Sequence, residues 1–205
     1  MITIGLCGGI ASGKSEVGRL LAARGAHVVD ADREAHLAYA PGTAGFDMLV
    51  DAFGRGIVGE DGVIDRRKLG DVVFGDADRL RQLTDIVWPL TRQRVESIKR
   101  EQAASGCQAF VVEAPLLIEA GWRDMVDEVW VVRAPVDVAR ERLMTRRGLS
   151  AADADARIAS RNLDRALAAA DVIIDNEGGF EELEAKVEAA WRAVLARAGS
   201  RISNG

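Results

Sequence analysis

The 205-residue sequence predicts an α/β fold built on a mostly parallel, five-stranded sheet. Five short apolar runs are rich in Val and Ile and lack strict alternation, which is typical of parallel strands covered on both faces. Amphipathic helix patterns lie between these runs, as crossover connections require. A cluster of glycines follows the first run directly, at the point where a helix is expected to begin.

The predicted strands cover residues 2–7, 26–30, 109–113, 128–132 and 171–175. The helix pattern after the first strand ends at Gly25, and a later one runs from residue 134 to Gly148, with a proline near its first turn. The final helix pattern extends from Phe180 to Ala198 and places four apolar residues on one face: Leu183, Val187, Trp191 and Val194.

Two segments depart from this alternation. Residues 31–106 are too long for one crossover helix, and Pro89 is expected to interrupt a long helical pattern there, so we interpret them as a helical insertion that holds a substrate. Residues 144–168 are polar and rich in arginine and are predicted to form a mobile lid. The sequence thus predicts one domain over residues 1–200, with core segments 1–30, 107–143 and 169–198, and a flexible tail at 199–205.

Composition excludes several classes of protein. A formal net charge of -5 argues against a nucleic-acid-binding groove over much of the surface. No signal peptide and no membrane-spanning segment is evident, so a cytoplasmic protein is expected. Cys7 and Cys107 give neither zinc-site spacing nor a disulfide framework, and Cys7 is expected to be inert packing at the end of a buried strand.

The glycine cluster, GLCGGIASGKSEV at residues 5–17, predicts a nucleoside triphosphate site. Gly8, Gly13, Lys14 and Ser15 match the pattern G-x-x-x-x-G-K-[ST] between a predicted strand and a predicted helix. Backbone N–H groups of such a loop face the phosphates, together with the positive end of the helix dipole. Lys14 is expected to reach the β- and γ-phosphates, and the Ser15 hydroxyl to bind Mg²⁺.

Other motifs narrow the class of nucleotide-binding protein. No Asn is followed by Lys, as a guanine-selecting site would require, and FVVEAP offers the single acid Glu113 where motor ATPases usually carry Asp-Glu. Asp30 and Asp32 follow the second strand, at the sheet edge where open α/β folds bind ligands. Asp32 fits the N-cap of the next helix, which does not exclude a catalytic role, and the functional interpretation is that it accepts a proton from an attacking hydroxyl.

The stretch from Arg133 to Arg165 contains eight arginines and no lysine. Planar guanidinium groups match the equatorial oxygens of a transferring phosphoryl group, although about half of these arginines are expected to lie on solvated helix faces. The candidates for catalysis are Arg142, Arg146 and Arg147, which cluster before Gly148. Ser150 and Asp153 have the spacing of a capping box that restarts a helix.

These motifs together resemble the dephospho-CoA kinase family, from the first strand to about residue 195. The stretches that carry the resemblance are, in chain order, IGLCGGIASGKS, VVDADREAH, WPL, VVEAPLLIEAG, RLMTRRGLSAADADARI and ADVIIDNEG. The resemblance implies a P-loop kinase core, a helical CoA-binding insertion and an arginine-rich lid. It also implies ATP-dependent phosphorylation of the ribose 3′-hydroxyl of dephospho-CoA, with Mg²⁺, by a monomer or small homo-oligomer.

The resemblance also implies roles for particular residues. Asp32 would be the catalytic base, and Arg142 would stabilise the transferring group. The residues that would bind ATP are Ala11, Ser12, Gly13, Lys14, Ser15, Glu16, Arg146, Arg147 and Asn176. Those that would contact the acceptor, besides Asp32, are Gly9, Pro115, Leu116, Leu117 and Glu119.

The sequence departs from the family pattern at three positions. Ala11 stands where the family often has Gly, and Glu16 where a small or apolar residue is common. Trp88 precedes Pro89 where the family usually has His. A kinase for another nucleoside or nucleotide, and a regulatory protein that binds ATP without turnover, remain alternatives from the residues alone.

Overall fold

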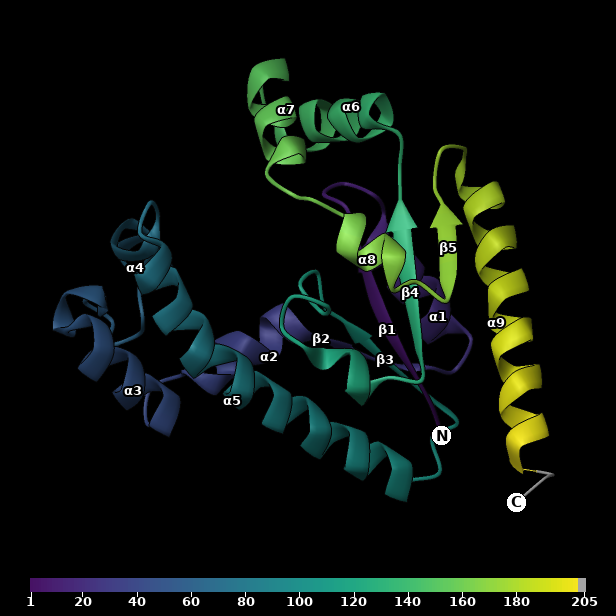
Figure 1. The fold of residues 1–205 in the computed structure, drawn as a ribbon, viewed down its shortest axis with the longest axis horizontal. Helices are drawn as coiled ribbons and strands as arrows, with labels where there is room; N and C mark the ends of the chain where they lie inside the picture. The colour runs from purple at the N-terminus through teal and green to yellow at the C-terminus, as the bar shows by residue number, and fades with distance from the viewer. Residues whose placement is uncertain (203–205) are drawn as a thin grey trace. The chain divides into compact units, whose positions relative to one another are not determined.

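The computed structural model describes the backbone of residues 1–202 and the side chains of residues 1–198. The predicted flexible tail at 199–205 lies outside the described side chains. The chain forms two compact units, one made of residues 1–29 and the chain from residue 101 onwards, the other of residues 30–100 (Figure 1).

The first unit contains a five-stranded sheet in the order β2-β3-β1-β4-β5. The strands are β1 (Ile2–Gly8), β2 (His27–Asp30), β3 (Ala109–Glu113), β4 (Glu128–Arg133) and β5 (Val172–Asp175). The central strand β1 pairs in parallel with β3 and β4, and β4 pairs in parallel with β5. The predicted fold class is confirmed, and every predicted strand lies within one residue of the observed bounds.

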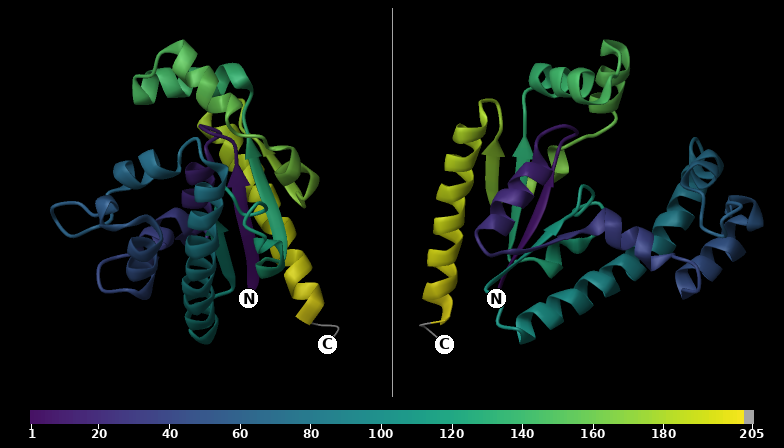
Figure 2. Two further views of the ribbon diagram at one scale, coloured as in Figure 1. Left: turned by 60° about the vertical axis from the view of Figure 1, so that its left-hand side comes forward. Right: turned by 180° about the vertical axis from the view of Figure 1, so that it is seen from behind.

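Alternate residues of β1 serve the two faces of the sheet. Ile4 and Leu6 pack into a buried core with α1 (Lys14–Ala23) and α9 (Phe180–Ile202), which cover one face (Figures 1 and 2). Cys7 belongs to the other face, where α8 (Asp164–Ala168) lies (Figure 1). Cys7 is buried, as predicted, and burial raises the pKa of its thiol to about 11, which favours the protonated form at neutral pH.

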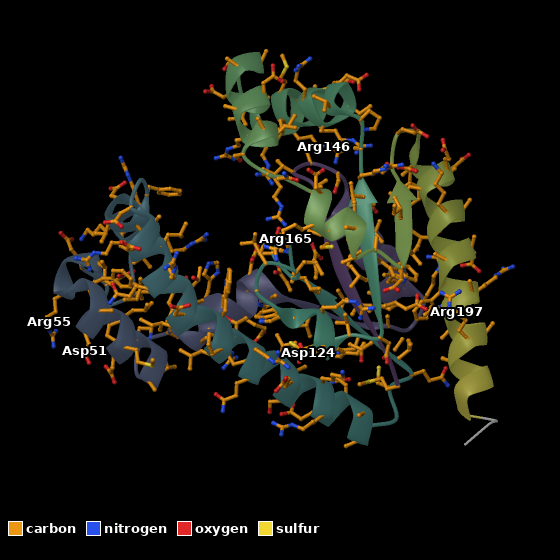
Figure 3. The ribbon with its side chains drawn as sticks, viewed as in Figure 1. Asp51, Arg55, Asp124, Arg146, Arg165 and Arg197 are labelled. Carbon is orange, nitrogen blue, oxygen red and sulfur yellow. The ribbon has the colours of Figure 1, made fainter. Side chains whose placement is uncertain are left out.

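A buried carboxylate at the start of β4 accepts hydrogen bonds on both of its oxygens. Glu128 accepts hydrogen bonds from the indole Nε1 of Trp130 (3.0 Å) and from Nε and Nη2 of Arg197 (2.8 and 2.9 Å). Arg197 belongs to α9 and is labelled in Figure 3. The ion pair therefore ties the last helix to the sheet that carries the glycine loop.

Two helices follow β4, namely α6 (Val136–Arg147) and α7 (Ala151–Ala159), and they pack against each other (Figure 1). Gly148 is the C-cap of α6, and Ser150 is the N-cap of α7. The Ser150 hydroxyl accepts from the backbone N–H of Asp153 (3.1 Å) and donates to its carboxylate (2.6 Å). The predicted helix restart at Ser150 is confirmed. A short 3₁₀ turn, η2 (Trp122–Met125), precedes β4.

The second unit consists mainly of helices: α2 (Ala31–Ala38), α3 (Ala44–Phe53), the 3₁₀ turn η1 (Arg55–Ile57), α4 (Arg66–Val73) and most of α5 (Ala77–Ala104). A small core of its own holds these helices together: Leu49, Ile57, Ile64, Leu69 and Val73. The unit spans residues 30–100. The predicted helical insertion has the different bounds 31–106, and its role as a substrate-binding segment stays a prediction.

Pro89 does not interrupt the helical pattern, so that prediction is wrong. The helix α5 continues through Pro89, which removes one backbone donor but leaves the turns on either side intact. Asp85, whose carbonyl would accept from residue 89, is exposed, so water can replace the missing bond. The Thr91 hydroxyl also donates to the Val87 carbonyl in the following turn (2.7 Å).

Among the helices of residues 1–202, none has the length and apolar character needed to cross a bilayer.

Candidate active site

The glycine loop connects the carboxyl end of β1 to the first turn of α1, and two of its glycines are required by close approaches. A Cβ atom at Gly8 would lie 2.3 Å from the Val132 carbonyl oxygen of the neighbouring strand. Gly13 is the N-cap of α1 with φ of 93°, and a Cβ there would lie 2.1 Å from Nδ2 of Asn176. Glycine therefore lets the loop pass tightly between β4 and the end of β5.

Three side chains meet at the start of α1. The Lys14 ammonium lies 2.5 Å from Oε1 of Glu113, and the Ser15 hydroxyl donates to the same oxygen at 2.8 Å. The strand register places Glu113 beside Leu6, two residues before the loop begins at Gly8. The predicted phosphate-binding lysine and metal-binding serine are thus held by a common carboxylate.

Glu113 is a site residue whose role the sequence alone did not indicate. Its side chain is 11% exposed and that of Lys14 is 14% exposed, so the pair is largely shielded from water. The sequence feature that indicates Glu113 is an acid at the carboxyl end of an apolar strand. Open α/β sheets bind their ligands at that end of the strands.

The oxygen ligands present fit a magnesium ion. Mg²⁺ prefers carboxylate, hydroxyl and phosphate oxygens and is usually held by only one or two protein groups together with substrate phosphates. Ser15 and Glu113 supply a hydroxyl and a carboxylate within hydrogen-bonding distance of each other. Within the described side chains, no group of three His, Cys, Asp or Glu residues forms a ready-made metal site.

Two side chains hold the glycine loop through hydrogen bonds: Arg142, which lies on α6, and Asn176, which directly follows β5. The Arg142 guanidinium donates to the carbonyls of Ala11 (3.3 Å) and Ser12 (3.4 Å), and to Asn176 Oδ1 (3.0 Å). Asn176, which is 5% exposed, donates from Nδ2 to the Ser12 carbonyl at 2.7 Å. Burial lowers the pKa of Arg142, and neighbouring Arg146 lowers it further. The structure thus brings these two predicted residues to the loop.

The remaining predicted ATP-binding residues lie on the loop, on α1 and at the end of α6. Ala11 has a left-handed backbone, with φ of 56°, and Ser12 is buried. Glu16 pairs with Arg19 on the surface of α1. Arg146, labelled on α6 in Figure 3, and Arg147 are exposed at the end of that helix.

The predicted acceptor-contacting stretch has mixed surroundings. Leu117 is fully buried and packs against Gly5, so it supports the sheet. Pro115 is partly exposed, and Leu116 is exposed. Gly9 packs against Leu163, 3.2 Å from where its Cβ would be.

Two charged side chains of the same unit have buried atoms that lack hydrogen-bond partners among the described residues. These atoms are Oε2 of Glu119 and Nε and Nη2 of Arg161. Both groups influence the pKa of Cys7, so they lie near the end of β1. Arg161 is a second residue whose role the sequence alone did not indicate, because it is one of eight arginines between residues 133 and 165. Buried polar atoms without a hydrogen-bond partner are expected where a polar ligand binds.

In the second unit, backbone hydrogen bonds identify the aspartate that is the N-cap of α2. Oδ1 of Asp30 accepts from the backbone N–H groups of Asp32 (2.9 Å) and Arg33 (3.3 Å), which makes Asp30 the N-cap. The alternative that Asp32 is the N-cap is therefore wrong. Asp32 lies in the first turn of α2 and is exposed. Its carboxylate is not required to start the helix.

Comparisons of the sequence with known proteins identify relatives of this chain. A family-wide sequence description of dephospho-CoA kinase matches residues 2–182. The dephospho-CoA kinase of Symbiobacterium thermophilum is 45% identical over 210 residues, which cover 100% of this chain and 86% of that protein.

Solved structures share the fold. TT1252 from Thermus thermophilus superimposes with a TM-score of 0.77 at 34% identity, over 96% of this chain and 97% of that one. The dephospho-CoA kinase of Campylobacter jejuni gives a TM-score of 0.70 at 24% identity, over 94% of this chain and 96% of that one. Since the family description covers most of the sequence and the relatives align over nearly its whole length, the chain belongs to the dephospho-CoA kinase family.

Proposed function

We propose that the protein transfers the γ-phosphoryl group of ATP to the ribose 3′-hydroxyl of dephospho-CoA, giving coenzyme A and ADP, the last step of coenzyme A synthesis. The observation that carries this proposal is the cluster of Lys14, Ser15 and Glu113 at the end of a G-x-x-x-x-G-K-S loop. Membership of the dephospho-CoA kinase family identifies the acceptor.

On the nucleotide side, the protein positions the triphosphate and neutralises its charge. Lys14 exchanges its contact with Glu113 for the β- and γ-phosphate oxygens, while the start of α1 directs its dipole at them. Arg142 and Asn176 hold the loop carbonyls, so the loop keeps its shape when phosphates enter. The family resemblance also assigns Asn176 to the adenine of ATP.

The metal belongs on the same side. Ser15, with Glu113 behind it, would hold Mg²⁺, which when bound neutralises phosphate charge during transfer. Arg146 and Arg147 are exposed at the end of α6 and are assigned to the nucleotide phosphates. Guanidinium groups of this kind stabilise the charge on the equatorial oxygens of the transferring group.

On the acceptor side, Asp32 is assigned as the base. It takes the proton of the 3′-hydroxyl as that oxygen bonds to the γ-phosphorus and the bond to the β,γ-bridging oxygen breaks, releasing ADP. Asp32 can do this without cost to the helix, because Asp30 is the N-cap of α2. Glu119 and Arg161, with their unpaired buried atoms, are assigned to polar groups of the acceptor.

The test is an assay of ADP release with several acceptors. Dephospho-CoA should support turnover, whereas adenosine and AMP should do so poorly. A 3′-deoxy analogue of dephospho-CoA should be inert and a 2′-deoxy analogue active. Faster turnover with AMP or adenosine would support a nucleotide or nucleoside kinase, and ATP binding without any acceptor-dependent turnover would support a regulatory protein.

The proposal includes a cytoplasmic location and a monomer or small homo-oligomer. Cys7 and Cys107 are free thiols, which suits a reducing compartment. Fractionation of cells and sedimentation of the purified protein test these two points.

A further inference from the structure

The helical unit of residues 30–100 contains an apolar cleft that has no role in the steps above. Its volume is about 140 Å³. Helices α2, α4 and α5, together with the residue at the C-cap of α2, line it with apolar side chains: Ala35, Tyr39 (the C-cap), Leu69, Leu83, Val87 and Trp88. Thr84 also lines it, but its hydroxyl donates a hydrogen bond to the Arg81 carbonyl at 2.8 Å. The cleft, named here the α2–α5 cleft, therefore suits an apolar occupant.

Size and aromatic lining both favour a flat ring. An apolar cavity of about 150 Å³ is large enough to hold benzene. The α2–α5 cleft is of that size, and because Tyr39 and Trp88 are only partly buried, it is open to solvent and can admit one end of a larger molecule. Aromatic side chains bind nucleobases by stacking, a contact that every base can make through its π-face.

The proposed base Asp32 lies on the same helix as the cleft. Asp32, Ala35 and Tyr39 are spaced by three and four residues, so they share one face of α2. Asp32 therefore lies about one helical turn, roughly 5 Å along the axis, from Ala35, the cleft residue nearest to it on α2. In a nucleoside the base and the 3′-hydroxyl are attached to the same five-membered ring, with one ring carbon between their attachment points. A nucleoside whose 3′-hydroxyl meets Asp32 can thus reach the cleft with its base.

The charged groups around this face suit a nucleoside diphosphate. The rings of His36 and Tyr39 lie edge to face, with centroids 5.9 Å apart. Burial lowers the pKa of His36, and Arg66 at the start of α4 lowers it further, while Asp32 raises it. Arg66 and Asp32 therefore both lie near this aromatic pair, a cation for phosphate and an anion for a hydroxyl.

We propose that the α2–α5 cleft binds the adenine ring of the acceptor, with Trp88 as its stacking surface. This inference rests on the proposed function, because the acceptor is dephospho-CoA. The cleft would then determine the orientation of the acceptor: adenine in the cleft, the 3′-hydroxyl at Asp32 and the diphosphate toward Arg66. Trp88 contributes to specificity for an adenine-containing acceptor and not to the chemical step.

The experiment compares four variants by steady-state kinetics with dephospho-CoA and ATP varied in turn. Trp88→Leu removes the ring, Trp88→Phe keeps a smaller one, and Ala35→Leu fills the cleft from α2. Phe74→Leu is the matched control, since Phe74 is an aromatic residue of the same unit that is 83% exposed and does not line the cleft. Adenosine, which carries the base but no diphosphate or arm, is tested at saturating ATP as a competitor of dephospho-CoA.

Trp88→Leu and Ala35→Leu should each raise the KM for dephospho-CoA about tenfold or more, on the scale of base–aromatic stacking. Trp88→Phe should have a smaller effect, and Phe74→Leu should have none. The kcat and the KM for ATP should stay within about twofold of wild type, which a general loss of folding would not allow. Adenosine should compete in the wild type and lose affinity in Trp88→Leu by a similar factor.

Three results would overturn the inference. One is an unchanged KM for dephospho-CoA in both Trp88→Leu and Ala35→Leu. Another is a raised KM for dephospho-CoA while the inhibition constant of adenosine is unchanged, which would place the arm of the acceptor in the cleft. The third is a wild-type enzyme that adenosine does not inhibit at all. Failure of the proposed function is distinct, because the wild type would then release no ADP with dephospho-CoA.

Discussion

Replacing Lys14 with Met should destabilise the protein in the absence of nucleotide. A lysine that only faces phosphates would contribute little to folding, but Lys14 lies 2.5 Å from Glu113, and both side chains are largely buried. Lys14→Met leaves the Glu113 carboxylate in place with the Ser15 hydroxyl as its donor at 2.8 Å. The structure therefore changes what this substitution is expected to do.

The magnitude follows from the burial of the pair. Removing one partner of a buried ion pair typically costs about 3–5 kcal/mol, because the remaining charge is uncompensated. The side chains here are 14% and 11% exposed and Ser15 still donates, so we expect a loss of about 2–4 kcal/mol. The double variant Lys14→Met with Glu113→Gln has no buried charge at this point and should fall within about 1 kcal/mol of wild type.

The assay is urea unfolding of the wild type, both single variants and the double variant, without ATP or Mg²⁺. Arg19→Met is the matched control, because Arg19 pairs with Glu16 on the exposed face of the same helix. An exposed pair of this kind contributes about 0–1 kcal/mol. All variants that lack Lys14 should also lose kcat by roughly 10²–10⁴, on the scale of electrostatic stabilisation of the transition state.

The reasoning fails if Lys14→Met unfolds at the same urea concentration as the wild type. It also fails if the double variant is less stable than Lys14→Met, because the two charges would then not compensate each other. Loss of stability together with full turnover would show that Lys14 is a structural residue only.

Three further substitutions test separate parts of the site. Asp32→Asn should fold normally, because Asp30 caps α2, yet lose roughly 10²–10⁴ in kcat; full activity would contradict its role as base. Arg142→Lys should lose about tenfold or more in kcat, because one ammonium cannot reach Ala11, Ser12 and Asn176 together; wild-type kcat would make the brace dispensable. Ala11→Gly should raise the free energy of unfolding by about 0.5–1 kcal/mol, because φ of 56° suits glycine; a lower value in urea unfolding would contradict this.

The sheet and the loop were predictable from local sequence because their signals are local. Strands buried on both faces appear as uninterrupted Val and Ile runs, and the loop pattern is fixed by the needs of a phosphate. The predicted fold class and the resemblance to the family both depend on these local signals, and both are confirmed. The path of α5 was not predictable, because tolerance of Pro89 depends on the exposure of Asp85 and on the Thr91 hydroxyl, which sequence alone does not give.

The predicted site was incomplete where it depends on contacts between distant residues. Glu113 follows Lys14 by 99 positions, and only the β1–β3 register brings it to the loop. Arg161 could not be singled out from eight arginines, because its distinguishing feature is buried atoms without partners. Asp30 and Asp32 have equal capping propensity, so the choice between them required the backbone at the start of α2. The roles of all these residues in catalysis remain predictions.

The bonds of Arg142 limit where the predicted lid can begin. Because Arg142 is tied to the glycine loop, α6 cannot swing away at or before this residue without breaking those contacts. Arg146 and Arg147 are exposed beside the Gly148 C-cap, where the helix ends. Trypsin should therefore cut the free protein after Arg147 before it cuts after Arg140 or Arg142, and ATP with dephospho-CoA should slow that cut. First cleavage at Arg140 or Arg142 would show that α6 opens as a whole and that the brace does not hold, while cleavage at Arg147 that ignores both ligands would refute the lid at residues 144–168.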